Sequence, residues 1–505
     1  MPLLTQGRDN LASAGLDVAR LNGQVYTPLS LADAIVAGLT WSDGGLLDPA
    51  CGDGVFLEAA VRRAVREGRS VGDIAGWDLD PDAVSAARTR LQGVCDALGV
   101  AGPDQPDGPR LRVGDALEMG PERPVSVVVG NPPYLEAKRM PTALKARVRD
   151  RCPVAAHGGF DLYSAFVELG ARWLTEGGEL ALVVPNRVLV TRSNAPLRRL
   201  LLSLGRVTVC DLSDQDVFGR EAAVYPVVLG LERGAAPVYR VVHDDTPAEL
   251  PAAIIADRLG HLMPVLPHDP VLHGLVSRVL TDASLPALQT RLEVRWTVSF
   301  HRAGLREQYV SADRPDSPHA RRFLGGGRFS GNRELAPYAI TWAGAWIDHD
   351  EERARADRNG LPPRALFDAP KVVFAQNARR CRAALDTTGL VLKDTFPLIR
   401  LREDADPDLL PWLVLVLNSA LFHVIYEALF GGTRKGGRFL HFLGSYLHPF
   451  PLPDPPAGAR DLHDALARSP DDPDLHARAE ALVRAAYRVT PAEAAALDTL
   501  DVPAP

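Results

Sequence analysis

Short apolar runs alternate with longer amphipathic stretches between about Gly44 and Arg233, and this pattern restricts the possible folds more than any other feature of the chain. Such an alternation is typical of strands and crossover helices, which build a parallel sheet covered on both faces. We therefore expect an α/β fold with a doubly wound, mostly parallel, Rossmann-like sheet. The predicted parallel strands are Gly45–Asp48, Ile74–Asp78, Leu111–Val113, Val125–Val129, Glu179–Val184 and Val207–Leu212, with Ala223–Leu231 as the last strand and Val55–Glu67 and Leu162–Leu174 as helices.

The regular alternation ends after Arg233, where the sequence becomes richer in proline and mixed in character. We predict four parts: residues 1–21 as an amino-terminal extension, 22–235 as the α/β domain, 236–455 as a mixed α+β module and 456–505 as a helical tail. Expected elements of the last two parts are the strands Lys371–Ala375 and Leu390–Leu392 and the helices Leu410–Leu429, Ala457–Ala467 and Pro473–Tyr487.

The chain of 505 residues carries a formal net charge of −7. This charge excludes a protein coated on all sides with phosphate-binding cations, so any nucleic-acid site must be a local basic surface. Two stretches supply such cations: Lys371, Arg379, Arg380, Arg382 and Lys393 against Asp386, and Arg434, Lys435 and Arg438. Ordinary solvated charge is the alternative interpretation of each stretch.

No apolar run approaches the roughly 20 residues that cross a bilayer. The five cysteines are scattered and lack the paired spacing of a zinc site or a disulfide framework. A cytoplasmic protein with no membrane contact and no metal site is therefore expected.

The first motif with chemical content is the turn Asp48-Pro49-Ala50-Cys51-Gly52-Asp53-Gly54, which lies between a buried strand and a helix. Gly52 and Gly54 allow the backbone to approach a ligand closely at the helix amino terminus. Asp48 and Asp53 disfavour a phosphate at this position and favour a cationic ligand, such as a sulfonium with an amino-acid tail.

Two further acidic residues follow the ends of neighbouring strands. Asp78 ends the next strand, where a carboxylate can accept both hydroxyls of a ribose. Asp80 precedes Pro81 and is predicted to cap a helix instead. Asp115 also follows a strand and could accept the amino group of an adenine.

The strand Val125–Val129 leads into Gly130 and the turn Asn131-Pro132-Pro133-Tyr134. Two prolines remove backbone donors and fix the turn, so the Pro132 carbonyl and the Asn131 side chain are two acceptors for one amino group. Holding both hydrogens of that group frees the nitrogen lone pair to attack a methyl donor. Tyr134 supplies an aromatic face on which a planar base can stack.

With these residues the sequence resembles the amino-methyltransferases, and within them the gamma-class (Taq-type) DNA adenine-N6 methyltransferases. Asn22-Gly23-Gln24-Val25-Tyr26-Thr27-Pro28 resembles the amino-terminal cofactor motif of that class, and Phe160–Phe166 and Val183–Asn186 resemble later motifs. The resemblance implies S-adenosyl-L-methionine as the cofactor. It assigns Thr27, Asp48, Ala50 and Pro133 to the methionine part, Asp78 to the ribose, and Leu79 and Asp115 to the adenine, beside the glycine turn of Gly52 and Gly54.

The same resemblance places Phe218 beside Tyr134 as a second aromatic against the flipped base, with core packing as the alternative. Ala116 departs from the family pattern, because relatives often carry an aromatic residue there against the cofactor adenine. The carboxy-terminal half resembles the family's target-recognition domain, and its candidate base-reading residues are Arg302, Arg328, Arg333, Gln376 and Asn377.

The function that the resemblance implies is methyl transfer to the exocyclic N6 amino group of an adenine flipped out of double-stranded DNA. A monomeric modification enzyme with a possible cognate restriction endonuclease is expected. Methylation of protein glutamine or of RNA, and a non-catalytic DNA-binding subunit of a restriction system, are the alternatives. Attack by a cysteine on a cytosine ring is disfavoured, because no Pro-Cys nucleophile lies in the turn.

Overall fold

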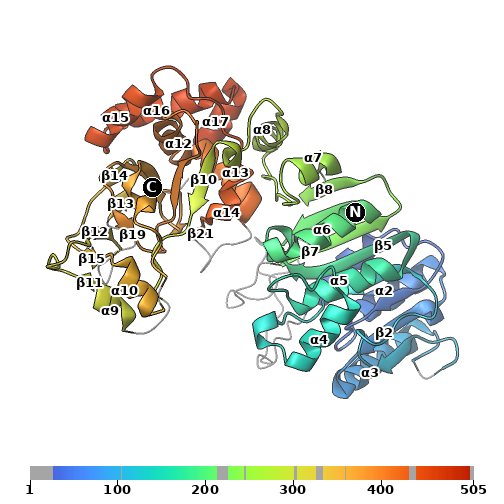
Figure 1. Cartoon of the computed structure of the whole chain (residues 1–505). Coiled ribbons are helices and arrows are strands. Elements are labelled where there is room, and N and C mark those ends of the chain that lie inside the picture. Colours follow the sequence, from blue (N-terminus) through green and yellow to red (C-terminus); the bar gives the residue numbers. More distant parts are fainter. Residues whose placement is uncertain are drawn as a thin grey trace. The chain divides into compact units, whose positions relative to one another are not determined.

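A computed structural model describes residues 27–103, 105–212, 226–243, 246–300, 304–325, 334–358, 360–431 and 439–500. The chain divides into two compact units, Met1–Val265 and Leu266–Pro505 (Figure 1). Each unit has its own sheets and helices, and the two are described separately.

The first unit is built on a nine-stranded sheet with the order β3-β2-β1-β4-β5-β7-β6-β8-β9. Pairing is parallel from β3 to β5, whereas β7 runs antiparallel to both β5 and β6. The strands are β1 Leu46–Asp48, β2 Ile74–Asp78, β3 Arg110–Val113, β4 Val125–Gly130, β5 Leu174–Pro185, β6 Gly205–Asp211, β7 Pro226–Arg233, β8 Val238–His243 and β9 Thr246–Pro251. The predicted mostly parallel α/β sheet is confirmed.

Helices cover both faces of this sheet because neighbouring residues of the buried strands point in opposite directions. Leu46 belongs to the hydrophobic core under α1, α2 and α3, whereas Leu47 belongs to the core that includes α5. The helices of the unit are α1 Leu29–Ala37, α2 Val55–Glu67, α3 Pro81–Leu98, α4 Thr142–Arg151, α5 Leu162–Trp173, α6 Ala195–Leu204 and α7 Ala252–Asp257, with the short 3₁₀ turns η2 Val71–Asp73, η3 Ala137–Arg139, η4 Asn186–Leu189 and η5 Arg192–Asn194.

The division between the units lies 30 residues beyond the boundary predicted at residue 235. β8 pairs with β6 in parallel and β9 pairs with β8, so both strands extend the sheet of the first unit. Tyr239 on β8 is fully buried, and its hydroxyl donates to the Pro264 carbonyl oxygen at 2.7 Å. The loss of regular alternation after Arg233 therefore marks the outer part of the sheet.

The second unit combines small sheets with helices, as expected for a mixed module. Its four-stranded sheets have the orders β10-β20-β16-β18 and β11-β15-β12-β19, and two-stranded pairs are formed by β13 with β14 and by β17 with β21. The strands are β10 Leu292–Arg295, β11 Val310–Ser311, β12 Ala320–Leu324, β13 Leu335–Ala336, β14 Ala339–Ile340, β15 Trp346–Asp348, β16 Lys371–Phe374, β17 Asn377–Ala378, β18 Ala383–Asp386, β19 Val391–Leu392, β20 Leu398–Leu401 and β21 Leu440–His441.

The helices of the second unit are α8 Pro270–Thr281, η6 Leu288–Thr290, α9 Leu305–Tyr309, α10 Glu351–Ala356, α11 Ala365–Asp368, α12 Leu409–Leu417, α13 Ala420–Phe430, α14 Gly444–Leu447, α15 Ala459–Arg468, α16 Pro473–Ala486 and α17 Pro491–Thr499. The tail predicted as a separate part is thus three helices of this unit.

The single helix predicted over Leu410–Leu429 is wrong, because the chain bends by 73° between α12 and α13. Asn418 pairs its side-chain amide with the backbone of Ala383 on β18, and the Ser419 hydroxyl accepts from the Phe422 amide and caps α13. Within the described ranges, no single helix has the length and apolar character to span a bilayer, although this bent pair meets both criteria when taken together.

Lys371 is fully buried and so is not part of a basic surface, contrary to the prediction from its stretch of sequence. Its ammonium group donates to the Phe367 carbonyl oxygen at 2.7 Å and forms an ion pair with Asp386 on the neighbouring strand. The Asp386 carboxylate also accepts from both the amide and the hydroxyl of Thr388 and from the Leu390 amide. This ion pair, whose two charged groups have further hydrogen-bond partners, joins β16 to β18 inside the second unit.

Lys371→Met is expected to lower the free energy of unfolding of the second unit by about 3–5 kcal/mol, because it leaves a buried carboxylate without its counter-charge. Denaturant unfolding measures the effect. Arg460→Met is the matched control, since the Arg460–Asp408 pair is nearly half exposed on both sides and should contribute at most about 1 kcal/mol. Equal destabilisation in the two variants would contradict a structural role for the buried pair.

Candidate functional site

Four strand ends meet at one edge of the sheet of the first unit. Because β3, β2, β1 and β4 are adjacent and parallel, the segments that follow them come together at their carboxyl ends. Ligands of open α/β sheets bind at this edge. The edge contains nearly all the described residues that the sequence predicted for the site.

Asp48 ends β1 and lies beneath the glycine turn. Its carboxylate is 1% exposed, and burial raises its pKa well above the usual range of an aspartate. One oxygen, Oδ1, accepts from the Ala50 amide at 3.1 Å, whereas Oδ2 has no hydrogen-bond partner among the described residues. A buried acceptor without a partner is costly, so this oxygen indicates a place for a donor or a cation.

The glycine turn has the geometry expected of a ligand cradle. Gly52 and Gly54 have φ values of 52° and 86°, in the left-handed region that glycine adopts without steric cost. Gly54 lies at the amino terminus of α2, and its amide closes the turn onto the Cys51 carbonyl oxygen at 2.8 Å. The turn thus presents backbone at the carboxyl end of β1.

Asp78 at the end of β2 is fixed by two backbone amides. Its Oδ2 accepts from Gly52 at 2.9 Å, and its Oδ1 accepts from Asp80 at 3.0 Å. A carboxylate has about four acceptor positions, so two remain for a ligand. Asp80 caps α3 by accepting from the Asp82 amide at 2.9 Å, which confirms its predicted role.

Two apolar side chains lie exposed beside Asp78. Leu79 is 68% exposed and Val113 is 52% exposed, and Val113 is the register partner of Asp78 on β3. Exposed aliphatic residues at adjacent strand ends form an apolar surface that suits a flat heterocycle. Ala116 is buried in the core and therefore does not belong to this exposed apolar surface. Sequence analysis did not include Val113 among the site residues, and only its position at the end of a predicted strand could have indicated it.

Asp115 follows β3, two residues beyond Val113, but its carboxylate is bound by protein groups. Its Oδ1 accepts from the Leu117 amide at 2.9 Å, and its Oδ2 forms an ion pair with Arg147 of α4 at 2.9 Å. The Arg147 guanidinium also pairs with Glu118 at 2.7 Å. Asp115 therefore connects the candidate site to α4.

The Asn131–Tyr134 turn begins where β4 ends and is held from both sides. The Asn131 side-chain amide donates to the Thr27 hydroxyl at 3.2 Å, so the described end of the amino-terminal motif contacts this turn. Pro132 is buried and Pro133 is exposed. The Tyr134 hydroxyl donates to the Val183 carbonyl oxygen of β5 at 3.1 Å.

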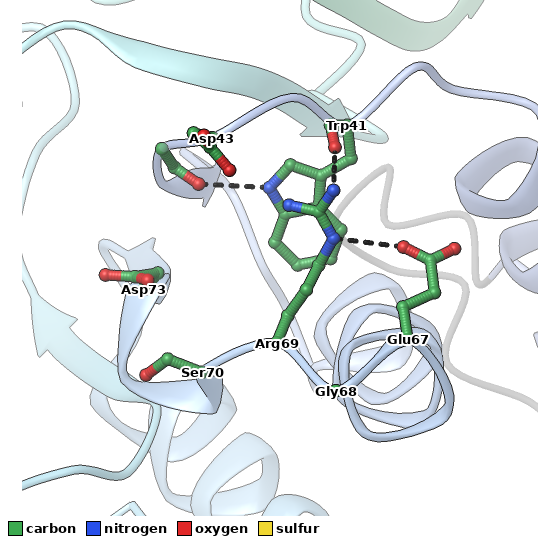
Figure 2. A pocket seen from close by; sticks show the side chains of 8 residues that line it. Trp41, Asp43, Glu67, Gly68, Arg69, Ser70 and Asp73 are labelled. Carbon is green, nitrogen blue, oxygen red and sulfur yellow. Dashed lines mark hydrogen bonds and ion pairs between the residues drawn. The ribbon is translucent and has the colours of Figure 1, made fainter.

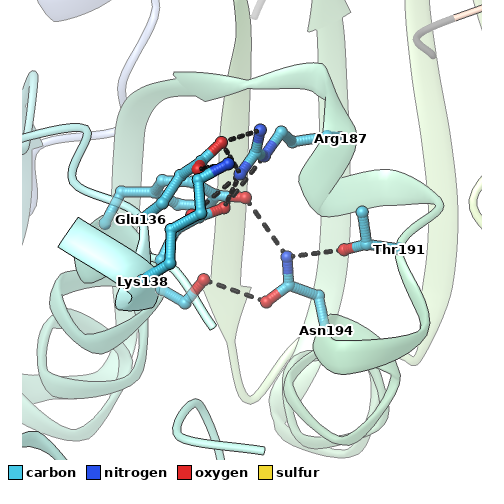
Figure 3. Close-up of polar contacts among 8 residues, drawn as sticks. Glu136, Lys138, Arg187, Thr191 and Asn194 are labelled. Atoms are coloured by element: carbon cyan, nitrogen blue, oxygen red, sulfur yellow. Dashed lines mark hydrogen bonds and ion pairs between the residues drawn. The ribbon is translucent and has the colours of Figure 1, made fainter. Parts of the chain in front are cut away.

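The segment after this turn is fixed by a polar network that the sequence did not predict (Figure 3). The Arg187 guanidinium forms a bidentate pair with Asp161 at 2.8 and 2.9 Å and also donates to Glu136 at 3.2 Å. Asp161 precedes α5 but does not cap it. In the sequence, Asp161 was visible only as an acidic residue of the Phe160–Phe166 motif. Its partner Arg187 is 26 residues away, so no local pattern indicates the pair.

A second part of the network lies behind Tyr134. The Tyr134 and Tyr163 rings meet edge to face, with centroids 6.1 Å apart. The Tyr163 hydroxyl accepts from the Asn194 side-chain amide at 3.2 Å, and Asn194 also contacts Ser164 and Thr191. Both Tyr163 and Asn194 are 1% exposed, so the Tyr134 ring rests against fixed neighbours.

Several predicted residues lie outside the described residues, including Phe218, Arg302, Arg328 and Arg333. Of the other two candidate base-reading residues, Gln376 is half-buried and Asn377 is exposed on β17.

A hollow of about 490 Å³ lies elsewhere in the first unit (Figure 2). It is lined by Trp41, Asp43, Gly44, Glu67, Gly68, Arg69, Ser70 and Asp73. Gly44 and Asp73 lie just before the strands β1 and β2, so the hollow lies at the amino ends of the strands. Arg69 crosses it, contacting Glu67 and the Trp41 backbone, and none of the predicted site residues lines it.

Comparison with known families agrees with the two-unit division. The model of the Eco57I restriction-modification methylase family matches residues 122–218, which include the Asn131–Tyr134 turn and Arg187. The model of the TaqI-like C-terminal specificity domain matches residues 329–452. Part of the first unit is thus similar to a restriction-modification methylase, and part of the second unit is similar to a TaqI-like specificity domain.

Two curated relatives illustrate the similarity of this chain to known proteins. The Type II methyltransferase M.BstVI of Geobacillus stearothermophilus is 30% identical over 235 residues, which cover 41% of this chain and 42% of that protein. The Type II methyltransferase M.TthHB8I of Thermus thermophilus is 33% identical over 221 residues, which cover 42% of this chain and 45% of that protein. The chain thus spans less than half the length of these two relatives.

Solved structures extend the similarity in fold over both units. The Type IIL restriction-modification enzyme MmeI in complex with DNA aligns with a TM-score of 0.55 at 14% identity, over 90% of this chain and 72% of that chain. A nuclease-deletion mutant of the Type ISP enzyme LlaGI aligns with a TM-score of 0.50 at 11% identity, over 88% of this chain and 54% of that chain.

Gly130→Ala is expected to destabilise the protein by about 1–3 kcal/mol, because a Cβ atom there would lie 2.5 Å from Asp48 Oδ1, and the residue has a φ of 152°. Thermal unfolding measures the change. Gly93→Ala is the control, since its Cβ would meet nothing within 4 Å inside α3 and alanine favours a helix. A Gly130→Ala protein as stable as the wild type would show that Asp48 does not require this close approach.

Proposed function

We propose that this chain transfers a methyl group from S-adenosyl-L-methionine to the N6 amino group of an adenine flipped out of double-stranded DNA. One observation carries the proposal: the partnerless buried carboxylate oxygen of Asp48 and the Asn131–Tyr134 turn lie at the ends of adjacent strands. This arrangement supports the proposal that Asp48 binds the cationic cofactor and that the neighbouring turn binds the amino group.

The residues of the carboxyl edge fit this cofactor. Asp48 Oδ2 supplies an acceptor for the cationic methionine part, and the Asp78 carboxylate has acceptor positions left for two ribose hydroxyls. Leu79 and Val113 supply an apolar surface for the adenine ring. Thr27, Ala50, Gly52, Gly54, Asp115 and Pro133 complete the proposed cofactor site. When bound, the sulfonium supplies an activated methyl group.

The target base is proposed to bind at the Asn131–Tyr134 turn. The Asn131 side-chain oxygen and the Pro132 carbonyl oxygen accept the two amino hydrogens, so the nitrogen lone pair points toward the methyl carbon. Tyr134 stacks on the base, supported by the edge of Tyr163. Most of the rate enhancement then comes from positioning, since neither residue needs to act as a strong base. Phe218 remains a proposed second aromatic contact.

The TaqI-like specificity domain supports DNA as the substrate, because methylation of a protein amide or a free RNA would not need it. Target recognition is proposed for the second unit, with Gln376, Asn377, Arg302, Arg328 and Arg333 as candidate readers. A cognate restriction endonuclease, a monomeric state and a cytoplasmic location belong to the same proposal.

Transfer of a radiolabelled methyl group tests the substrate class. The purified chain is incubated with labelled cofactor and, in separate reactions, with mixed-sequence duplex DNA, duplex DNA without adenine, RNA and protein. We expect label only in the adenine-containing duplex. Label on protein alone would favour glutamine methylation and would contradict the proposal.

Asn131→Ala is expected to lower the methylation rate by about 100-fold or more, because one of the two acceptors for the amino group is missing at the transition state. Single-turnover kinetics measure the rate, and calorimetry should show that cofactor binding persists. A rate within a few-fold of wild type would remove Asn131 from the proposed catalytic role.

Asp78→Ala is expected to weaken cofactor binding by roughly 10-fold to 100-fold, the range for hydrogen bonds to a charged acceptor. Asp80→Ala is the matched control, because Asp80 caps α3 and should reduce only thermal stability. Similar dissociation constants for the Asp78→Ala and Asp80→Ala proteins would contradict the ribose assignment.

The cofactor dissociation constant should fall as pH rises, because a cation beside Asp48 favours its ionised form. Burial raises the pKa of Asp48 in the free protein, so binding should release a proton at pH values below that raised pKa. Above it the affinity should level off. Titration calorimetry in buffers of different ionisation enthalpy measures the released proton.

Asp48→Asn should remove this pH dependence while weakening binding. The control ligand is 5′-methylthioadenosine, which lacks both the sulfonium and the amino-acid tail and should release no proton. Proton release with that ligand would show that another group titrates.

A further inference from the structure

A strongly basic segment follows the Asn131–Tyr134 turn. Residues 138–151 contain the cations Lys138, Arg139, Lys145, Arg147, Arg149 and Arg151, with Asp150 as the only acidic residue. The whole chain carries a net charge of −7, whereas the net charge of this segment is positive. We call residues 138–151 the basic segment.

Most of the basic segment faces solvent. Val148 is the only buried residue of α4, and η3 has none. Lys145 with Arg149 and Arg147 with Arg151 place like charges four residues apart, which destabilises an isolated helix. Core packing explains Met140, Leu144 and Val148 but not the repeated cations, whereas a bound polyanion would relieve their repulsion.

Contacts in the second half of α4 and just before residue 138 fix the basic segment at the carboxyl edge of the sheet. Arg147 pairs with Asp115 at 2.9 Å, and Arg151 donates to the Leu117 carbonyl oxygen at 2.9 Å. Asp115 and Leu117 both lie in the loop after β3. At the other end, the Ala137 amide donates to the Phe160 carbonyl oxygen at 2.8 Å. The cations are thus presented next to the turn that is proposed to hold the target base.

The cations differ in how far protein groups neutralise them. Arg147 is shared between Asp115 and Glu118, and Lys138 pairs with Glu136 at 2.6 Å. Within the described part of the chain, Arg139 and Lys145 have no ion pair, and the Arg149 guanidinium lies over the Phe160 ring at 5.8 Å. Arg139 and Lys145 are therefore the cations best able to meet an external anion.

We propose that the basic segment binds the phosphate backbone of duplex DNA beside the flipped adenine, through Arg139 and Lys145 above all. The inference rests on the proposed function and adds a DNA-contacting surface on the methylase unit, distinct from the specificity domain. Phosphate contacts carry no sequence information, so this surface orients the duplex over the site and leaves base reading to the second unit.

The test measures binding of the full-length chain to a duplex that the wild type methylates and to an unrelated duplex, at several salt concentrations. Replacing Arg139 and Lys145 together by Gln should weaken binding to both duplexes by a similar factor. The slope of log affinity against log salt should become shallower by about 0.9 for each phosphate that the variant no longer neutralises, hence by about 2 for the pair. Cofactor affinity and thermal stability should stay at wild-type values.

Two controls separate the effect of these two positions from the effect of net charge. Arg66→Gln with Arg110→Gln makes the same change in net charge at exposed positions on α2 and β3, and should leave the salt slope unchanged. The swap of Arg139→Lys with Lys145→Arg keeps the charge and should keep the slope.

A wild-type salt slope in the Arg139→Gln/Lys145→Gln protein, with DNA methylation by the wild type intact, would overturn the phosphate-binding surface and leave the proposed function standing. A slope lowered equally by the Arg66→Gln/Arg110→Gln control would also overturn it, since net charge alone would then explain the effect. Wild-type protein that neither binds nor methylates duplex DNA would overturn the proposed function itself.

Discussion

The candidate site depends on the close approach of Gly130 to the buried carboxylate of Asp48, which lets the ends of the paired strands β1 and β4 pack side by side. Asp48 ends β1 beneath the glycine turn, and Gly130 ends β4 immediately before Asn131. A side chain at position 130 would occupy the space of the Asp48 carboxylate. The pairing of β1 with β4 makes the glycine turn and the Asn131–Tyr134 turn neighbours, and the lack of a Cβ atom at Gly130 leaves room between them for the Asp48 carboxylate.

Near this contact, the segment after the Asn131–Tyr134 turn is held by charged contacts, whereas the hydrogen bonds of the turn to Thr27 and β5 are uncharged. The Asn131–Tyr134 turn contacts Thr27 and β5 through single hydrogen bonds, whereas the segment after it is fixed by the Arg187 pair with Asp161 and Glu136. Such surrounding contacts restrict the orientation of the groups that touch a substrate. The basic segment is joined to the same network through Glu136 and Lys138, so duplex binding there would act on the turn itself.

The elements that periodicity determines were predictable from the sequence. Helix α2 has the predicted bounds, and β2 does as well, because buried strands and amphipathic helices have distinct apolar spacing. Asp80 was predictable as a cap because a single local rule, an acid before a proline, decides it. The position of Asp48 and Asp78 at the carboxyl ends of β1 and β2 was also predictable, since it follows from the strand bounds alone.

Features that depend on distant partners could not be predicted in this way. Lys371 belongs to a cationic stretch of sequence, yet it is buried because it forms an ion pair with Asp386 on β18, the strand paired with β16. Asp161 was expected only as part of a helical motif, because nothing local indicates Arg187 as its partner. Asn418 ends an apolar helix by pairing with the backbone of Ala383, and the apolar pattern continues through that break. Pairing between remote segments decides each of these cases.

The most direct test of the account is the identity of the methylated nucleoside. Duplex DNA is incubated with the chain and a cofactor that carries a trideuterated methyl group, then digested to nucleosides and analysed by mass spectrometry. We expect trideuteromethyl groups on the N6 atom of deoxyadenosine and on no other nucleoside. Deuterated methyl on cytosine, or on no nucleoside while the cofactor is consumed, would contradict it.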